Sequence, residues 1–130
     1  MIKPCDPRMY VILREDLAYK YIQGAHALAG FALRYPQAFK EWKNQYLINL
    51  SVFNGLALEQ IEVDLKMKRL EVVDKYKEEE GQVMTPFTVW DYTTFYEPDL
   101  KSELPTAICI FENGEGFVSD FLSSLKLATK

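Results

Sequence analysis

The stretch that decides the fold class is Arg8-Met9-Tyr10-Val11-Ile12-Leu13. It is a short apolar run rich in strand-forming residues, and the prolines before it, Pro4 and Pro7, are excluded from the interior of a central strand. We therefore expect a buried strand over 8–13. The pattern then changes, because small and aliphatic residues recur at helical spacing over 17–33. That spacing predicts a helix packed closely against a sheet.

The rest of the chain continues the alternation of strands and helices. In all, strands are expected over 8–13, 46–52, 84–90 and 106–111. Helices are expected over 17–33, 36–44, 57–79 and 117–127. This order predicts one α/β domain over residues 1–130, with a four-stranded mixed sheet flanked by helices. The polar, proline-bearing segment 91–105 is expected to be a loop of the kind that carries function.

The composition predicts a compact protein of a reducing compartment. The chain has 130 residues, of which 48% are hydrophobic, so one core is expected. Cys5 and Cys109 share no metal-binding or redox spacing, which favours a cytoplasmic protein with reduced thiols. No apolar run has the length of a membrane span, and the first residues lack the apolar segment of a signal peptide. We expect no membrane partner.

Charge and motif content exclude several kinds of function. The net charge is -4, which opposes the basic surface that long nucleic acids require. One histidine and two distant cysteines supply no zinc set, and the chain has no glycine-rich phosphate loop. Neither a metal nor a cofactor is therefore expected. The charged clusters of the long helix are interpreted as solvated faces.

Polar residues follow two of the predicted strands. Arg14 to Asp16 follow the first strand and Asp91 to Thr94 follow the third, at the edge of an α/β sheet where ligands bind. His26, the only histidine, lies three residues after Gln23 and on the same helix face. It is the obvious acid-base candidate, although a structural role is the simpler interpretation of a single histidine on an alanine-rich helix.

Four short motifs at 10–17, 23–27, 89–94 and 105–110 follow one another in an order that is typical of one enzyme family. Together they resemble the peptidyl-tRNA hydrolase 2 family, whose chains carry V-x-R-x-D-L, A-Q-x-x-H-A, V-x-D-A-G-R-T-Q and P-G-T-x-T-V-L. The resemblance implies that family's fold and places Asp91 and Thr94 on its aspartate and threonine. It further implies tRNA as a partner and ester hydrolysis as the activity.

The chain departs from the family at positions that matter for catalysis. The family's Gly-Lys pair at the start of the helix is absent, and Lys20 in the shortened segment 18–22 does not inherit the role of that lysine. Tyr92 and Thr93 replace A-G-R, and the loop after Thr94 is enlarged. A carboxylate needs a neighbouring base or cation to act on an ester, so hydrolysis is expected to be weak or absent.

Two hypotheses of different classes follow. The first is a non-catalytic binding protein that uses the family's scaffold to hold a small nucleotide-like ligand. A particular version is a viral sponge that sequesters a nucleotide immune signal. The alternative is a divergent hydrolase of the peptidyl-tRNA hydrolase 2 type, with Asp91, Thr94 and His26 as the working residues. A homodimer is expected, and a purely dimerising structural domain is a third option.

For the binding hypothesis, aromatic side chains would stack on a base while cations would contact phosphate. The candidate ligand-binding residues are Arg14, Asp16, Tyr19, Lys20, Tyr21, Gln23, Tyr92, Thr93, Phe95 and Tyr96. Arg14, His26, Asp91 and Thr94 are expected to converge on one pocket walled by Tyr19 or Tyr21 and by the segment 92–100. An ion pair between Arg14 and Asp91, which would hold two strand ends together without a ligand, is the structural alternative.

Overall fold

The computed structural model describes residues 5–43, 46–80, 91–98, 103–114, 122 and 124–127. Its strands are β1 (Cys5–Arg14), β2 (Tyr46–Val52), β3 (Asp91–Phe95), β4 (Ala107–Gly114) and the two-residue β5 (Lys126–Leu127). Its helices are α1 (Lys20–Arg34), α2 (Pro36–Trp42) and α3 (Gly55–Glu80). The predicted α/β class is confirmed.

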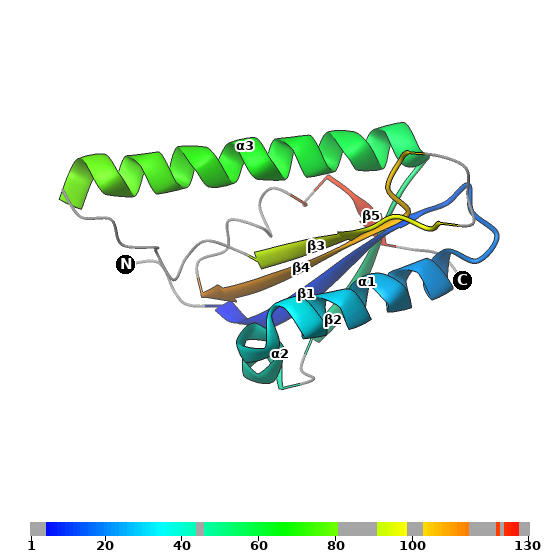
Figure 1. Ribbon diagram of the computed structural model, residues 1–130, viewed down its shortest axis with the longest axis horizontal. Coiled ribbons are helices and arrows are strands. Elements are labelled where there is room, and N and C mark those ends of the chain that lie inside the picture. The colour runs from blue at the N-terminus through cyan, green and yellow to red at the C-terminus, as the bar shows by residue number, and fades with distance from the viewer. Residues whose placement is uncertain are drawn as a thin grey trace.

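The strands form one mixed sheet with β1 inside it (Figure 1). Their order is β3-β4-β1-β2-β5, so four strands make up the body of the sheet as predicted and β5 adds two residues beside β2. β1 runs parallel to β2 and antiparallel to β4. At the middle of the sheet Ile12 lies between Leu50 of β2 and Ile108 of β4.

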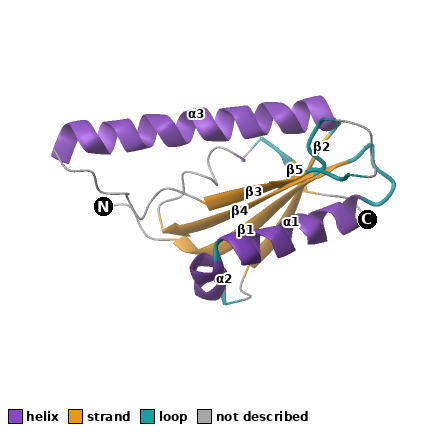
Figure 2. Cartoon of the chain, in the orientation of Figure 1, coloured by secondary structure: helices purple, strands orange, loops and turns teal. Residues whose placement is uncertain are grey.

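Alternate side chains of β1 supply two separate cores. Tyr10 and Ile12 pack with Leu58 and Leu65 of α3 on one face of the sheet. On the other face the odd-numbered neighbours Met9, Val11 and Leu13 pack with residues of α1 and α2. Figure 2 shows the result, in which α3 lies along one face and α1 and α2 cover the opposite one. The fold is therefore a three-layer sandwich whose middle layer is buried on both sides.

Gly24 lets α1 approach the sheet closely. A Cβ at this position would lie 2.6 Å from Leu13 Cδ2 and 3.0 Å from Val11 Cγ1. Leu13 has no exposed surface and lies in the middle of the α1-side core, so it has no space to move into. The small residues that the sequence places on this helix thus set the distance between helix and sheet.

The long helix α3 carries apolar residues on two sides. Its first turn is capped by Asn54, whose Oδ1 accepts a 3.0 Å hydrogen bond from the backbone N–H of Ala57. Leu58 and Leu65 are fully buried against the sheet. Outward-facing apolar residues of the same helix are exposed, namely Leu56, Val63, Met67 and Leu70. None of the helices in the described ranges combines the length and apolar character that a membrane crossing requires.

Two predictions about the C-terminal half need correction. The segment 91–95 was expected to begin a loop, but it forms β3, because it pairs along β4 and packs Tyr92 against one core and Phe95 against the other. The final helix predicted over 117–127 is wrong at its end, where Lys126 and Leu127 pair with β2. The strand predicted over 84–90 and most of the helix predicted over 117–127 lie outside the described residues.

Gly24→Ala is expected to lower the free energy of unfolding by about 1–2 kcal/mol, because the cost of overpacking exceeds the gain in helix propensity. Gly30→Ala is the matched control on the same helix. Its new Cβ would meet Thr93 Cγ2 at 3.4 Å, an ordinary contact. We expect that variant to be as stable as the wild type or more so. Urea denaturation measures both, and equal effects of the two substitutions would contradict the packing argument.

Candidate functional site

The side chain of Arg14 is fixed by contacts with other parts of the protein. Its Nε and Nη2 donate to the two carboxylate oxygens of Asp16 at 3.0 and 2.8 Å, and its Nη1 donates to the carbonyl of Pro105 at 3.1 Å. Gly55 leaves room for the guanidinium, since a Cβ there would lie 2.8 Å from Nη1. Only 8% of Arg14 is exposed. This arginine therefore joins the end of β1 to the start of α3 and to the segment before β4.

The polar residues at the start of α1 form a second group of contacts. Gln23 is buried, accepts a hydrogen bond from the hydroxyl of Thr106 at 3.0 Å and donates to Glu97 at 3.3 Å. Lys20 donates to Glu15 at 2.6 Å and lies over the ring of Tyr21. Tyr19 and Tyr21, both exposed, line a shallow hollow of about 430 Å³ formed by residues 17–22.

The predicted convergence of Arg14, His26, Asp91 and Thr94 on one pocket is wrong. Asp91 pairs with Phe111, which is level with Met9, so Asp91 lies about five residues or roughly 17 Å along the sheet from Arg14. The alternative ion pair between Arg14 and Asp91 is wrong for the same reason, and Asp16 takes the place of Asp91 as the partner of Arg14.

His26 and Thr94 are separated by the sheet itself. The imidazole of His26 stacks on Phe95 with ring centroids 4.8 Å apart, on the face that α1 covers. Thr94 is the next residue along the strand and points to the α3 face, because successive side chains of a strand point to opposite sides. Thr93 lies against Gly30 of α1, on the same face as His26. The three predicted catalytic residues therefore do not share one site.

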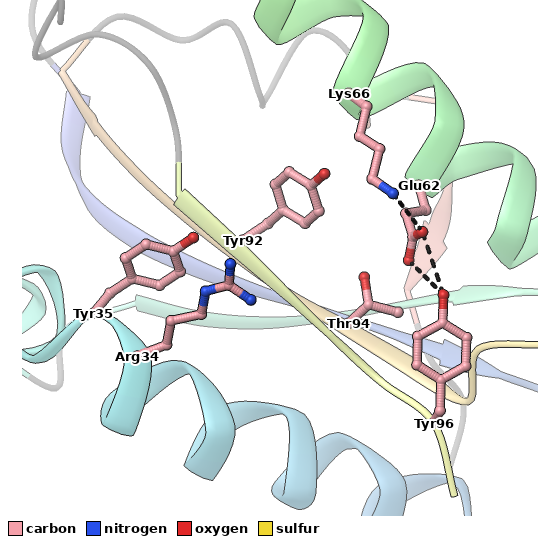
Figure 3. Close-up of a pocket in the computed structure, with 7 residues that line it drawn as sticks. All are labelled: Arg34, Tyr35, Glu62, Lys66, Tyr92, Thr94 and Tyr96. Atoms are coloured by element: carbon pink, nitrogen blue, oxygen red, sulfur yellow. Dashed lines mark hydrogen bonds and ion pairs between the residues drawn. The ribbon is translucent and has the colours of Figure 1, made fainter.

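A pocket of about 330 Å³ lies where the edge strand β3 meets α3 and the end of α1 (Figure 3). Among the described residues it is lined by Arg34, Tyr35, Glu62, Lys66, Tyr92, Thr94 and Tyr96. Three of these residues, Tyr92, Thr94 and Tyr96, were predicted from the sequence. The lining combines two cations, three phenol rings, one hydroxyl and one carboxylate, and its volume lies within the range of small-molecule sites.

Glu62 is the buried centre of the polar contacts in this pocket. Its carboxylate accepts hydrogen bonds from the Tyr96 hydroxyl, 3.1 Å from Oε2 and 3.3 Å from Oε1, and from Lys66 Nζ, 3.2 Å from Oε1. Only 8% of the residue is exposed. Burial alone would raise the pKa of Glu62, but the Thr94 hydroxyl, Lys66 and Tyr96 outweigh it and hold the pKa below its ordinary value. The carboxylate is therefore ionised at neutral pH.

The remaining polar groups are arranged at different depths of the pocket. Thr94 faces the carboxylate and helps to stabilise its charge, yet the buried Oγ1 meets no partner at hydrogen-bonding geometry among the described residues. Lys66 is more open, with 60% of its side chain exposed. Arg34 is exposed at the end of α1, over the ring of Tyr35, and forms no ion pair within the described ranges. The cations thus lie toward solvent and the carboxylate lies inside.

Sequence reasoning missed four of the lining residues. Arg34 and Tyr35 lie at the end of a helix whose pattern shows only an apolar stripe, and Lys66 belongs to a charged cluster that the pattern predicts to be a solvated face. Glu62 carried a detectable signal, because it is a charged residue four positions after Leu58 and three before Leu65, on the buried side of α3. A carboxylate on a buried helix face requires a partner or a function.

No protein-family model matches the chain, and no curated protein is significantly similar to it. The resemblance to the peptidyl-tRNA hydrolase 2 family therefore stays a prediction. Within the described parts of the chain, no cluster of three or more histidine, cysteine, aspartate or glutamate residues has an arrangement suited to a metal ion.

Arg14→Ala is expected to lower the free energy of unfolding by about 2–3 kcal/mol without any ligand, because it leaves the buried Pro105 carbonyl without its donor. Asp16→Asn is the control. The Asp16 side chain is 39% exposed, and loss of its charge should cost less than about 1 kcal/mol. Chemical denaturation separates the two cases. A stable Arg14→Ala protein would restore Arg14 as a candidate ligand-binding residue.

The lowered pKa of Glu62 predicts a pH-dependent contribution to stability. A carboxyl group whose pKa is lower in the folded than in the unfolded protein stabilises the fold above about pH 4.5, and this contribution is lost as the pH falls through the folded pKa. The difference in unfolding free energy between wild type and Glu62→Gln should therefore be constant from pH 7 to about 5 and shrink at lower pH. Denaturation at several pH values measures it. A difference that grows in acid would contradict the assignment.

Proposed function

We propose that the protein is a non-catalytic binding protein for a small nucleotide-like ligand, held in the pocket between β3, α3 and the end of α1. The observation that carries this proposal is the composition of the pocket lining. Arg34 and Lys66 supply two solvent-facing positive charges, and Tyr35 and Tyr92 supply aromatic rings in the same cavity. A nucleotide matches both kinds of group, because its base has flat faces that stack on aromatic rings and its phosphate is an anion that pairs with cations.

The size and polarity of the cavity support the same class of ligand. A volume of about 330 Å³ suits one mononucleotide-sized molecule and is too small for a stretch of nucleic acid. The acidic net charge of -4 also opposes long polyanions, whereas a local pair of cations is sufficient for one phosphate group. A protein that retains such a ligand without converting it would also meet the requirement of a nucleotide sponge.

The hydrolase alternative has less support. Ester hydrolysis needs its acid, base and orienting groups within hydrogen-bond reach of one reacting bond. His26 lies on the α1 face against Phe95, and Thr94 lines the pocket on the α3 face. Glu62 is tied to Lys66 and Tyr96 and has no histidine among its hydrogen-bond partners in the described residues. The geometry therefore supports binding over turnover.

Calorimetric titration with the four ribonucleoside monophosphates tests the proposal. We expect at least one of them to bind and to be recovered chemically intact, as judged by mass spectrometry. Lys66→Ala should weaken that binding about 10-fold or more, because a charge-assisted contact to phosphate is lost. Lys68→Ala, two residues along the same helix and outside the pocket lining, is the control and should bind as the wild type does.

Other results of the same titrations would contradict the proposal. If no nucleotide binds to the wild-type protein, or if Lys66→Ala and Lys68→Ala bind identically, the pocket is not the proposed site. Release of a base or phosphate during the titration would instead indicate an enzyme.

A further inference from the structure

The pocket proposed for an anionic ligand contains a buried negative charge. Glu62 is ionised, lies deeper than Arg34 and Lys66, and lines the same cavity. A carboxylate repels the phosphate of a nucleotide, so it can only favour binding if another part of the ligand donates hydrogen bonds to it. The lining therefore specifies a ligand with two different ends, one anionic and one that carries N–H donors.

The carboxylate of Glu62 has hydrogen-bonding capacity left for a ligand. An ionised carboxylate offers about four lone-pair positions. Lys66 donates one N–H to Oε1, and the single hydroxyl hydrogen of Tyr96 is shared between the two oxygens. Within the described part of the chain, about two acceptor positions remain once these contacts are counted. The nearby Oγ1 of Thr94, buried and without a partner at hydrogen-bonding geometry in the described part of the chain, adds a hydroxyl that is able to donate.

We propose that Glu62 recognises the base of the ligand and selects guanine. This inference rests on the proposed function and names the base. Guanine presents two adjacent donors, N1–H and the N2 amino group, which match the two oxygens of one carboxylate. Its neighbouring O6 is an acceptor, to which the Thr94 hydroxyl would donate by turning away from Glu62 once the base donates to that carboxylate. The base would lie inward beside Tyr92, with the phosphate outward toward Lys66 and Arg34.

The other bases fit this arrangement less well. Adenine and cytosine each present one amino group beside a ring nitrogen that is an acceptor, and that acceptor would face the negative charge of Glu62. Uracil presents a single N–H between two carbonyl oxygens, and hypoxanthine presents a single N–H between one carbonyl oxygen and a C–H group. Each of these bases leaves a buried acceptor of the protein without a donor or places two acceptors in contact, and both situations cost binding free energy.

Titration with GMP, IMP and AMP tests the selection of guanine. IMP differs from GMP only by the missing N2 amino group, so it isolates one of the two predicted contacts. We expect GMP to bind about 10-fold or more tightly than either IMP or AMP. In Glu62→Gln, which keeps the size of the side chain and removes its charge, GMP should lose that advantage and bind as AMP does. Thr94→Val should weaken GMP more than AMP.

Glu59→Gln is the matched control, because Glu59 is an exposed glutamate about one turn earlier on α3 and lies outside the pocket lining. It should keep the full preference for GMP. Thermal melting of each variant at pH 7 confirms that it is folded before titration. If GMP and AMP bind wild type equally, or if the preference survives in Glu62→Gln, selection of guanine through Glu62 is excluded while the nucleotide site stands. Failure of every nucleotide to bind would exclude both.

Discussion

The central strand β1 is apolar on both faces and hydrogen-bonded to a neighbour along each edge, and the other layers are arranged around this constraint. Its even-numbered residues Tyr10 and Ile12 require a cover on one face, which α3 provides. Its odd-numbered residues require another, which α1 and α2 provide. The side chains of a strand buried in this way all pack in the core, so residues that bind a ligand are confined to the edges and ends of the sheet. The pocket beside the edge strand β3 is one such place.

Glu62 connects the stability of the fold with the proposed recognition of a ligand. Without a ligand its charge is balanced by Lys66 of the same helix, and the hydrogen bond from the Tyr96 hydroxyl holds α3 against the segment that follows β3. A buried carboxylate is unfavourable without such partners. The same carboxylate lines the cavity, where the proposed ligand would donate to it. Glu62 therefore contributes to the stability of the fold and to the proposed ligand binding. These two roles explain why an ionised group is found on a helix face that is otherwise apolar.

The sequence predicted the architecture better than the site. The spacing of apolar residues was sufficient to predict β1, α1 and α3, because their apolar patterns are long and agree with the faces that are buried. It failed for β3, where the polar residues Asp91 and Thr93 suggested a loop although pairing with β4 makes them a strand. The expected site failed because sequence order does not reveal that Thr94 and Phe95 point to opposite faces. Arg34 and Lys66 come together in the pocket only through tertiary packing.

The position of β4 beside β1 has a consequence for how the chain is made. Met9 pairs with Phe111, roughly 100 positions later, so β1 gains its second neighbour only after that length of chain has been made. At ordinary rates of translation the first strand waits on the order of 5–20 s on the ribosome for that partner. During this interval β2 can pair with one edge of β1, while the other edge offers unsatisfied backbone groups to any extended chain nearby. The exposed edge of β1 therefore makes the nascent protein vulnerable to aggregation until β4 emerges.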